Sequence, residues 1–362
     1  LINLSSMKNN NYNPNDFSGQ RLLGARKISG LTLQGLADKM NMEISKQALN
    51  QFEKGQSKPT EKVLIALADA LNTPVDYFFK KTDIIIENIE FRRKKKLTDK
   101  ELASIKYKAI SYIEKTLEIE GILDIKNLFI NPLHKTTVKN KQDAEKLSIE
   151  LRKAWMQCNE PVADVIRLLE MNGVKVVEVE TPNYFSGMST MVNDIAVIVI
   201  NSDMNSVRKR LTALHELAHI ILTFPKGMDD EEIEDICFYF AAAFLVPAEV
   251  IFNDLGMRRT NLLLDEVIKF ENYYGISVQA FVRRIFNLGI ISESKFNSFK
   301  HWLNRTEMKD AEIGSFWSLE SPSRLRELVI KALSLEIITE SKAASLLDIP
   351  LSQLIDERTE II

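Results

Sequence analysis

Two histidines on one face of a predicted helix constrain the possible fold and function of this chain more than any other sequence feature. His215 and His219 lie four residues apart in the segment LTALHELAHIIL, residues 211–222. Because helical residues at this spacing share a face, both imidazoles can bind the same metal ion. The apolar residues around them predict a buried helix, either in the wall of an active site or in an ordinary core. The chain has only four histidines, so the spacing favours a zinc site over a chance pair of buried histidines.

Glu216 follows the first histidine and points about 100° away from it around the helix. At that offset its carboxylate can hold a metal-bound water molecule without binding the metal itself. A carboxylate placed in this way can take a proton from water and pass it to a leaving amine. The sequence therefore predicts Glu216 as a catalytic general base.

A catalytic zinc ion needs a third protein ligand and an open position for water. The residues after His219 are IILTF, so no third histidine follows at short range, and the acidic run DDEEIED (229–235) offers carboxylates instead. This run opens a helix predicted over 231–246, where acidic residues commonly complement the helix dipole and need no other role. Glu234 leads into the apolar half of that helix and is the residue expected to point inward.

Several short helical patterns, separated by Gly, Asn or Pro, fill residues 17–80. Their apolar residues recur at three- and four-residue intervals without a strand pattern, which predicts a compact all-α domain. TLQGLADKM and SKQALNQFEKG fit the support and recognition helices of a helix-turn-helix, with Thr32 and Ser45 as N-caps.

Four polar residues occupy the start and the exposed face of the second of these helices: Lys46, Gln47, Asn50 and Gln51. Gln and Asn suit paired hydrogen bonds to adenine, and Lys suits guanine or phosphate, so we predict that these side chains contact double-stranded operator DNA. Residues 17–80 hold nine basic against six acidic residues. This weak basic bias leaves an ordinary helical bundle without DNA affinity as the alternative.

The rest of the chain predicts an α+β domain followed by further helices. VKVVEVE and IAVIVI have the composition of strands, and the length of 362 residues favours two or three domains. In the linker, the basic run 92–96 is either solvated or a phosphate contact. We expect a multidomain fold with five segments: a disordered leader (1–16), an all-α helix-turn-helix domain (17–80), a basic linker and connecting helix (81–140), an α+β domain (141–290) and a helical C-terminal region (291–362).

Composition excludes several classes of protein. The net charge of −3, with 45% hydrophobic and 27% charged residues, is ordinary for a soluble globular protein and argues against overall attraction to nucleic acid or membranes. Two cysteines, Cys158 and Cys237, are too few for a disulfide framework and fit a reducing compartment. No apolar run approaches the ~18–20 residues that span a membrane. We therefore expect a cytoplasmic protein without a membrane partner.

The N-terminal region resembles an Xre-type repressor domain. The resemblance runs from GLTLQGLADKM to TPVDYFF and is most specific in SKQALNQFEKG and the KP that follows it. It implies DNA binding through the second helix of the pair. Because pseudo-palindromic operators are bound by symmetric dimers, we expect a homodimer.

A second resemblance, to the ImmA/IrrE zinc-peptidase family, lies in VRKRLTALHELAHIIL and EDICFYFAAAFLVP. The family pattern Arg-x-Thr-x-x-His-Glu-x-x-His is matched by Arg210, Thr212, His215, Glu216 and His219. Its second pattern, Glu-x-x-Ala-x-x-Phe-Ala-Ala-x-x-x-x-Pro, is matched by Glu234, Phe240, Ala241, Ala242 and Pro247. The resemblance implies a zincin-like fold and a gluzincin-like zinc metallo-endopeptidase in which Glu234 is the third zinc ligand.

Three residues depart from that family's pattern without removing a ligand. Cys237 stands in place of a small Ala, Phe238 where Asn is common, and Ala218 in place of Gly. Phe238 removes a side chain that could orient the site by hydrogen bonding.

The strand IAVIVI precedes the predicted zinc helix by about one loop. In zincin-like folds such a strand lies at the sheet edge, where an extended substrate could pair with it. An interior strand that does not contact substrate is the other interpretation, and the sequence leaves both open.

Two functions remain open at this stage. In the first, a DNA-binding regulator carries a zinc-dependent endopeptidase that hydrolyses a peptide bond in a protein substrate, which the family resemblance suggests is a repressor. In the second, the zincin-like domain is a non-catalytic sensor or protein-interaction module. Glu216 favours the first, because a sensor needs the two histidines but not this carboxylate. Self-processing in the basic linker is a third hypothesis.

Overall fold

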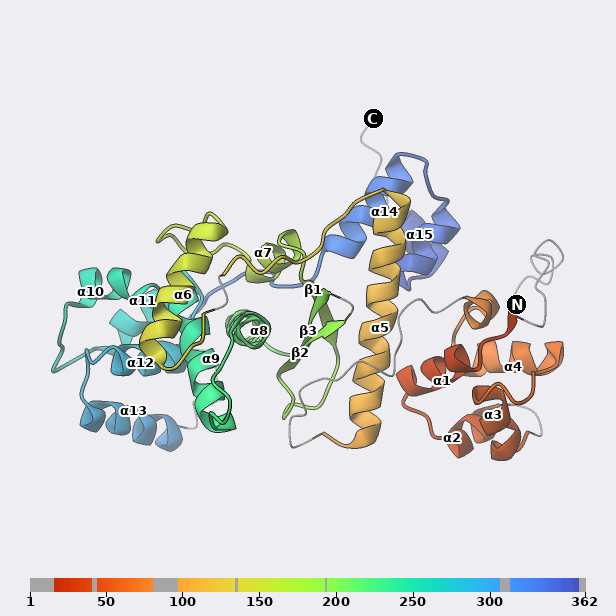
Figure 1. Ribbon diagram of the computed structural model, residues 1–362, viewed down its shortest axis with the longest axis horizontal. Coiled ribbons are helices and arrows are strands. Elements are labelled where there is room, and N and C mark those ends of the chain that lie inside the picture. Colours follow the sequence, from red (N-terminus) through yellow and green to blue (C-terminus); the bar gives the residue numbers. More distant parts are fainter. Residues whose placement is uncertain are drawn as a thin grey trace. The chain divides into compact units, whose positions relative to one another are not determined.

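The computed structural model describes residues 16–40, 44–80, 97–133, 136–192, 194–306 and 313–357 (Figure 1). The chain divides into two compact units, one made of the described residues up to Glu114 and the other of those from Lys115. The expected leader, apart from Asp16, and the basic run 92–96 lie outside the described residues. Both interpretations therefore stay predictions.

Over its described residues, the first unit contains helices and no strand. They are α1 (Gly19–Ile28), α2 (Leu33–Lys39), α3 (Lys46–Glu53), α4 (Glu61–Leu71), a 3-10 helix (Val75–Phe79) and the first part of α5 (Asp99–Ile122). Their shared core is fully buried at Leu22, Leu36, Leu49, Leu67 and Phe78. This arrangement confirms the expected all-α N-terminal domain.

A buried ion pair fixes α3 against α1. Arg26 Nε donates to Glu53 Oε1 at 2.5 Å and Arg26 Nη2 donates to Glu53 Oε2 at 2.7 Å. Both side chains are 7% exposed. A bidentate guanidinium–carboxylate pair has one preferred geometry, so it sets the direction in which α3 presents its outer face.

The second unit is built around a three-stranded sheet with the order β1-β3-β2. β1 (Lys175–Val179) runs parallel to β3 (Ile195–Asn201), and β2 (Gly187–Val192) runs antiparallel to it. β3 is therefore the central strand and is buried along its whole length. Of the two interpretations that the sequence left open, the edge strand is wrong and the interior strand is confirmed, because strands pair with β3 on both sides. The edge strand next to it is β2, which the sequence pattern did not predict.

In the described part of this unit, eight helices cover and extend the sheet. They are α6 (Lys141–Ala154), α7 (Val165–Met171), α8 (Ser206–Ile221), α9 (Asp230–Leu245), α10 (Ala248–Leu255), α11 (Leu264–Tyr274), α12 (Val278–Asn287) and α13 (Glu293–Arg305). α8 packs on β2 and β3 with one side and on α9 with the other, so it lies between the sheet and the helical layer (Figure 1). Together these elements confirm the α+β class of the region.

Three further helices end the described chain: α14 (Arg324–Ser334), α15 (Glu340–Leu347) and α16 (Leu351–Asp356). They pack in sequence, α14 on α15 and α15 on α16. Ion pairs join α15 and the residue after it to the last turns of α5, Lys342 with Glu118 and Asp348 with Lys115. The helical C-terminal region is thus part of the second unit and not a separate body.

Among the described residues, no single helix is both long and apolar enough to cross a membrane, although the bent pair α9 and α10 passes by length and composition together.

Candidate metal centre and DNA-reading helix

Helix α8 carries the paired histidines and begins at a well-formed cap. The Asn205 side chain accepts a hydrogen bond from the Arg208 backbone N–H at 3.0 Å, which satisfies one donor of the first turn. Further along, Leu214 and Leu217 are fully buried against the sheet and α9. The apolar residues that bury the helix thereby also bury the polar residues between them.

Three predicted ligands converge where α8 crosses α9. His215 Nε2 lies 3.1 Å from Glu234 Oε2, His219 Nε2 lies 3.2 Å from Glu234 Oε1, and the two Nε2 atoms are 3.1 Å apart. Four-coordinate zinc with bonds of about 2.0–2.1 Å separates its ligand atoms by roughly 3.3 Å. The observed spacings match that value within a few tenths of an ångström. The donor set, two imidazoles and one carboxylate, fits zinc with a fourth position left for water.

The electrostatics of Glu234 and His215 favour the protonation states that a metal requires. Hydrogen bonds from His215 and His219 hold the pKa of Glu234 well below its usual range. Burial lowers the pKa of His215, which is 2% exposed. A carboxylate beside neutral imidazoles is the form that binds a divalent cation, because protonated groups must first release a proton.

The other acidic residues of the run 229–235 have separate roles. Asp229 is the N-cap residue of α9, and Asp230, Glu231 and Glu232 form its first turn. Asp235 pairs with Lys141 and Arg283. Of this run, only Glu234 lies with the two histidines, as the sequence predicted.

Glu216 lies in the same helix turn but faces the sheet. Its Oε2 accepts a hydrogen bond from Ser189 Oγ at 2.9 Å, and the residue is 2% exposed. Ser189 belongs to the edge strand β2, which approaches α8 closely at Gly187. A Cβ on that glycine would lie 2.8 Å from Thr212 Cγ2 and 3.3 Å from Glu216 Cγ, so glycine permits this approach. Sequence reasoning missed Ser189.

The two histidines differ in what their second nitrogen contacts. His219 Nδ1 lies 3.4 Å from the Cys237 sulfur. His215 Nδ1 is buried and has no hydrogen-bond partner among the described residues, and the Phe238 ring covers that imidazole with a centroid separation of 4.0 Å and a tilt of 35°. An oriented hydrogen bond at the second nitrogen normally fixes a ligand histidine and strengthens it. Here a ring contact takes the place of that bond at His215.

Arg210 anchors α8 deep in the second unit. It is fully buried and pairs with Glu320, which is also fully buried. The guanidinium also donates to the carbonyl oxygens of Val162 at 2.7 Å and Gly275 at 3.2 Å. Glu320 in turn accepts from the backbone N–H of Val165 at 3.0 Å. Arg210 and Glu320 together thus fix α8 to the start of α7, the α11–α12 turn and the segment before α14. The sequence identified Arg210 as part of a pattern but gave no indication of Glu320.

The predicted DNA-contacting residues lie on α3 with three side chains exposed and Asn50 half-buried. The caps are formed as expected: Ser45 Oγ accepts from Ala48 N at 3.2 Å, and Thr32 Oγ1 accepts from Gly35 N at 3.0 Å. Leu49 is fully buried on the opposite face. The helix therefore directs its polar residues outward, although the residues 41–43 before it lie outside the description.

Two segments of the chain are similar to known families. Residues 24–78 match the family described as helix-turn-helix, and residues 170–286 match the IrrE N-terminal-like domain. No curated protein matches the chain. The first match contains α2 and α3, and the second contains α8 and α9 with the complete candidate metal centre. The chain therefore joins a helix-turn-helix domain of the DNA-binding type to a domain of the ImmA/IrrE peptidase type, which confirms the expected fused architecture.

Proposed function

We propose that this protein is a transcription regulator that binds operator DNA and carries a zinc-dependent endopeptidase. The observation that carries the proposal is the convergence of His215, His219 and Glu234 within 4.8 Å of one another, with Glu216 buried beside them. A binding site for metal alone needs the three ligands, whereas a hydrolytic site also needs a base. The combination therefore supports hydrolysis.

In this proposal each residue of the site has one task. His215, His219 and Glu234 would hold the zinc ion, which when bound polarises the scissile carbonyl and acidifies water. Glu216 takes the proton from the attacking water and delivers it to the leaving amine. Ser189 keeps that carboxylate oriented by donating to Oε2 at 2.9 Å. The burial of His215 and Glu216, which are each 2% exposed, strengthens these interactions.

The DNA-binding part of the proposal rests on α3. Lys46, Gln47, Asn50 and Gln51 are placed to contact bases and phosphates in the major groove. A symmetric operator would require two copies of the chain, so we propose a homodimer. Because such a regulator acts on DNA, we propose a cytoplasmic location and a protein substrate in the same pathway, in particular a repressor.

The test compares the wild-type protein with a Glu216→Gln variant, which keeps the size of the side chain and a partner for Ser189. Both full-length proteins, loaded with zinc, are incubated with a cell lysate, and new protein N-termini are identified by mass spectrometry. We expect a defined set of new N-termini with the wild type and a ~10²–10⁴-fold slower appearance with the variant. Equal cleavage by both proteins would refute the assigned base.

A second function is favoured by one observation, the unpartnered Nδ1 of His215 beneath Phe238. A less strongly fixed ligand suits a zinc sensor that releases metal readily. In that case the wild type would produce no new N-termini, and its affinity for operator DNA would change when zinc is removed with a chelator. Turnover by the wild type that depends on Glu216 would exclude this alternative.

A further inference from the structure

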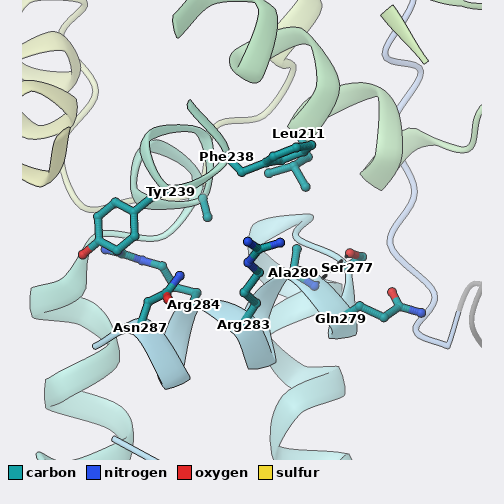
Figure 2. Close-up of a pocket in the computed structure, with 10 residues that line it drawn as sticks. Leu211, Phe238, Tyr239, Ser277, Gln279, Ala280, Arg283, Arg284 and Asn287 are labelled. Atoms are coloured by element: carbon teal, nitrogen blue, oxygen red, sulfur yellow. Dashed lines mark hydrogen bonds between the residues drawn. The ribbon is translucent and has the colours of Figure 1, made fainter. Parts of the chain in front are cut away.

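A pocket next to the candidate metal centre carries an inference about the substrate. It lies between α8, α9 and α12 and has a volume of about 240 Å³ (Figure 2). Phe238 lines the pocket, and its ring also contacts the His215 ring at 4.0 Å between centroids. The pocket therefore shares one aromatic side chain with the candidate metal centre.

The size of the pocket limits its occupant. Pockets that bury drug-sized ligands typically span roughly 300–1,000 Å³, so this smaller space suits a single amino-acid side chain. Leu211, Phe238, Ala242 and Ala280 provide apolar walls along which an aliphatic stem can lie. The pocket therefore fits one side chain of a peptide whose backbone passes the metal centre.

The charge at the pocket indicates what that side chain carries. Figure 2 shows Arg283 extending from α12 toward Phe238 and Leu211. Its side chain is 51% exposed and forms an ion pair with Asp235, which also binds Lys141 Nζ at 2.7 Å. An exposed guanidinium at an apolar pocket can bind a second carboxylate by donating two hydrogen bonds to it.

The neighbouring charged groups also favour an acidic substrate side chain. Arg284 is fully buried, and its Nη2 donates to Glu145 Oε1 at 2.7 Å. Arg283, Arg284 and Lys141 thus face Asp235 and Glu145, which leaves one positive charge in excess across these five groups. A basic substrate side chain would meet repulsion here, whereas an acidic one would be attracted.

We propose that this pocket receives a glutamate or aspartate side chain of the substrate, one residue close to the bond that is cleaved, and that Arg283 binds its carboxylate. The proposal rests on the proposed peptidase function. It adds a substrate class, acidic at one position, and a specificity-determining residue outside the ligands and the base.

The test profiles cleavage of a proteome-derived peptide library by zinc-loaded, full-length wild type and by Arg283→Glu. All peptides are amidated, so a chain-end carboxylate cannot supply the charge. We expect the wild type to enrich Glu or Asp at one position flanking the cleaved bond. The variant should change the ratio of acidic to basic residues at that position by about tenfold or more in favour of Lys and Arg.

The matched control is Arg326→Glu on α14. Arg326 is also 51% exposed and also ion-paired, with Glu357, but it does not line the pocket. We expect this control to cleave with the wild-type preference. Zinc content is measured for every protein, so that a disturbed metal centre is recognised directly.

A binding measurement provides a readout that does not depend on turnover. The Glu216→Gln protein is titrated with three peptides that differ only in Glu, Gln or Lys at the selected position. Tighter binding of the Glu peptide, lost when Arg283→Glu is added, supports the proposal. Cleavage with an apolar preference that Arg283→Glu leaves unchanged overturns the acidic pocket and leaves the peptidase intact. An absence of any cleavage by the wild type refutes the proposed function itself.

Discussion

Helices α3 and α8 carry the two candidate functions of this chain in opposite ways. On α3, the side chains of Lys46, Gln47 and Gln51 are exposed, whereas the apolar residues and Glu53, which pairs with Arg26, are buried. On α8, the functional residues His215 and Glu216 are each 2% exposed and lie inside the core of the second unit.

This difference determines how far each helix depends on the rest of the chain. The three exposed side chains of α3 are solvated and need no buried partner of their own. Each buried polar group of α8 needs a partner from a distant segment, because an unpaired polar group in a core costs free energy. Arg210 pairs with Glu320, which lies 110 residues away in the sequence. Glu216 accepts a hydrogen bond from Ser189, 27 residues away, and His215 contacts Glu234, 19 residues away.

The largest expected effect comes from breaking the most buried of these pairs. Arg210→Met leaves the Glu320 carboxylate buried without its cation, which should lower the free energy of unfolding by ~3–5 kcal/mol. Chemical unfolding of the second unit, followed by tryptophan fluorescence, measures the loss. Arg326→Met removes an exposed pair with Glu357 and should leave the free energy of unfolding nearly unchanged. Equal losses in the two variants would contradict the role given to Arg210.

A smaller effect is expected from the partner of the base. Ser189→Ala removes the hydrogen bond that orients Glu216, so peptide cleavage should slow by about 10–100-fold while zinc content stays the same. Ser202→Ala, which removes the hydroxyl that donates to Asp203 Oδ1 at 3.1 Å, is the control. Unchanged cleavage in Ser189→Ala would show that Glu216 is positioned by other contacts.

Sequence reasoning succeeded where the determinants are local. The helix predicted on residues 211–222 is observed as part of α8, Ser206–Ile221, and the helix predicted over 231–246 is observed as α9, Asp230–Leu245. The orientation of Glu234 could be predicted, because the helical period shows where this residue stands relative to the apolar half of α9.

The failures share one cause, pairing between distant segments. β3 was open to interpretation as an edge strand, because its neighbours on both sides are set by tertiary contacts and not by its own apolar run. β2, Gly187–Val192, lacks the composition of a strand, so Ser189 was missed with it. Glu320 follows a segment without a regular pattern, and its role depends on a contact with α8 that no short motif encodes.

A mutation on the exposed face of α3 should change DNA affinity and leave stability unchanged, whereas Arg210→Met on α8 should change stability. Gln47→Ala should weaken binding to the operator by ~1–3 kcal/mol, measured on duplexes selected from a random pool, because it removes a base contact. Since the side chain is solvated, the free energy of unfolding should change by no more than about 0.5 kcal/mol. Gln34→Ala on α2, another exposed glutamine, is the control. Loss of stability without loss of DNA affinity would refute the assignment of α3.

The smallest expected effect is a gain. Phe238→Asn offers His215 Nδ1 a hydrogen-bond partner in place of the ring and should tighten zinc binding by roughly tenfold, measured by chelator competition. Phe238→Leu removes the ring without adding a hydrogen-bond partner. It therefore separates the effect of losing the ring contact from the effect of gaining a hydrogen bond. If Asn and Leu change the affinity equally, the missing hydrogen bond has no influence on the metal.

The central claim is that α8 and α9 together bind zinc through Glu234. Metal content of the purified full-length protein, measured by inductively coupled plasma mass spectrometry, tests it most directly. Glu232→Ala is the matched control, since Glu232 is an exposed carboxylate in the first turn of the same helix. We predict about one zinc ion per chain in the wild type and in Glu232→Ala, and a large loss in Glu234→Ala. Equal zinc content in all three proteins, or none in the wild type after zinc loading, would contradict the account.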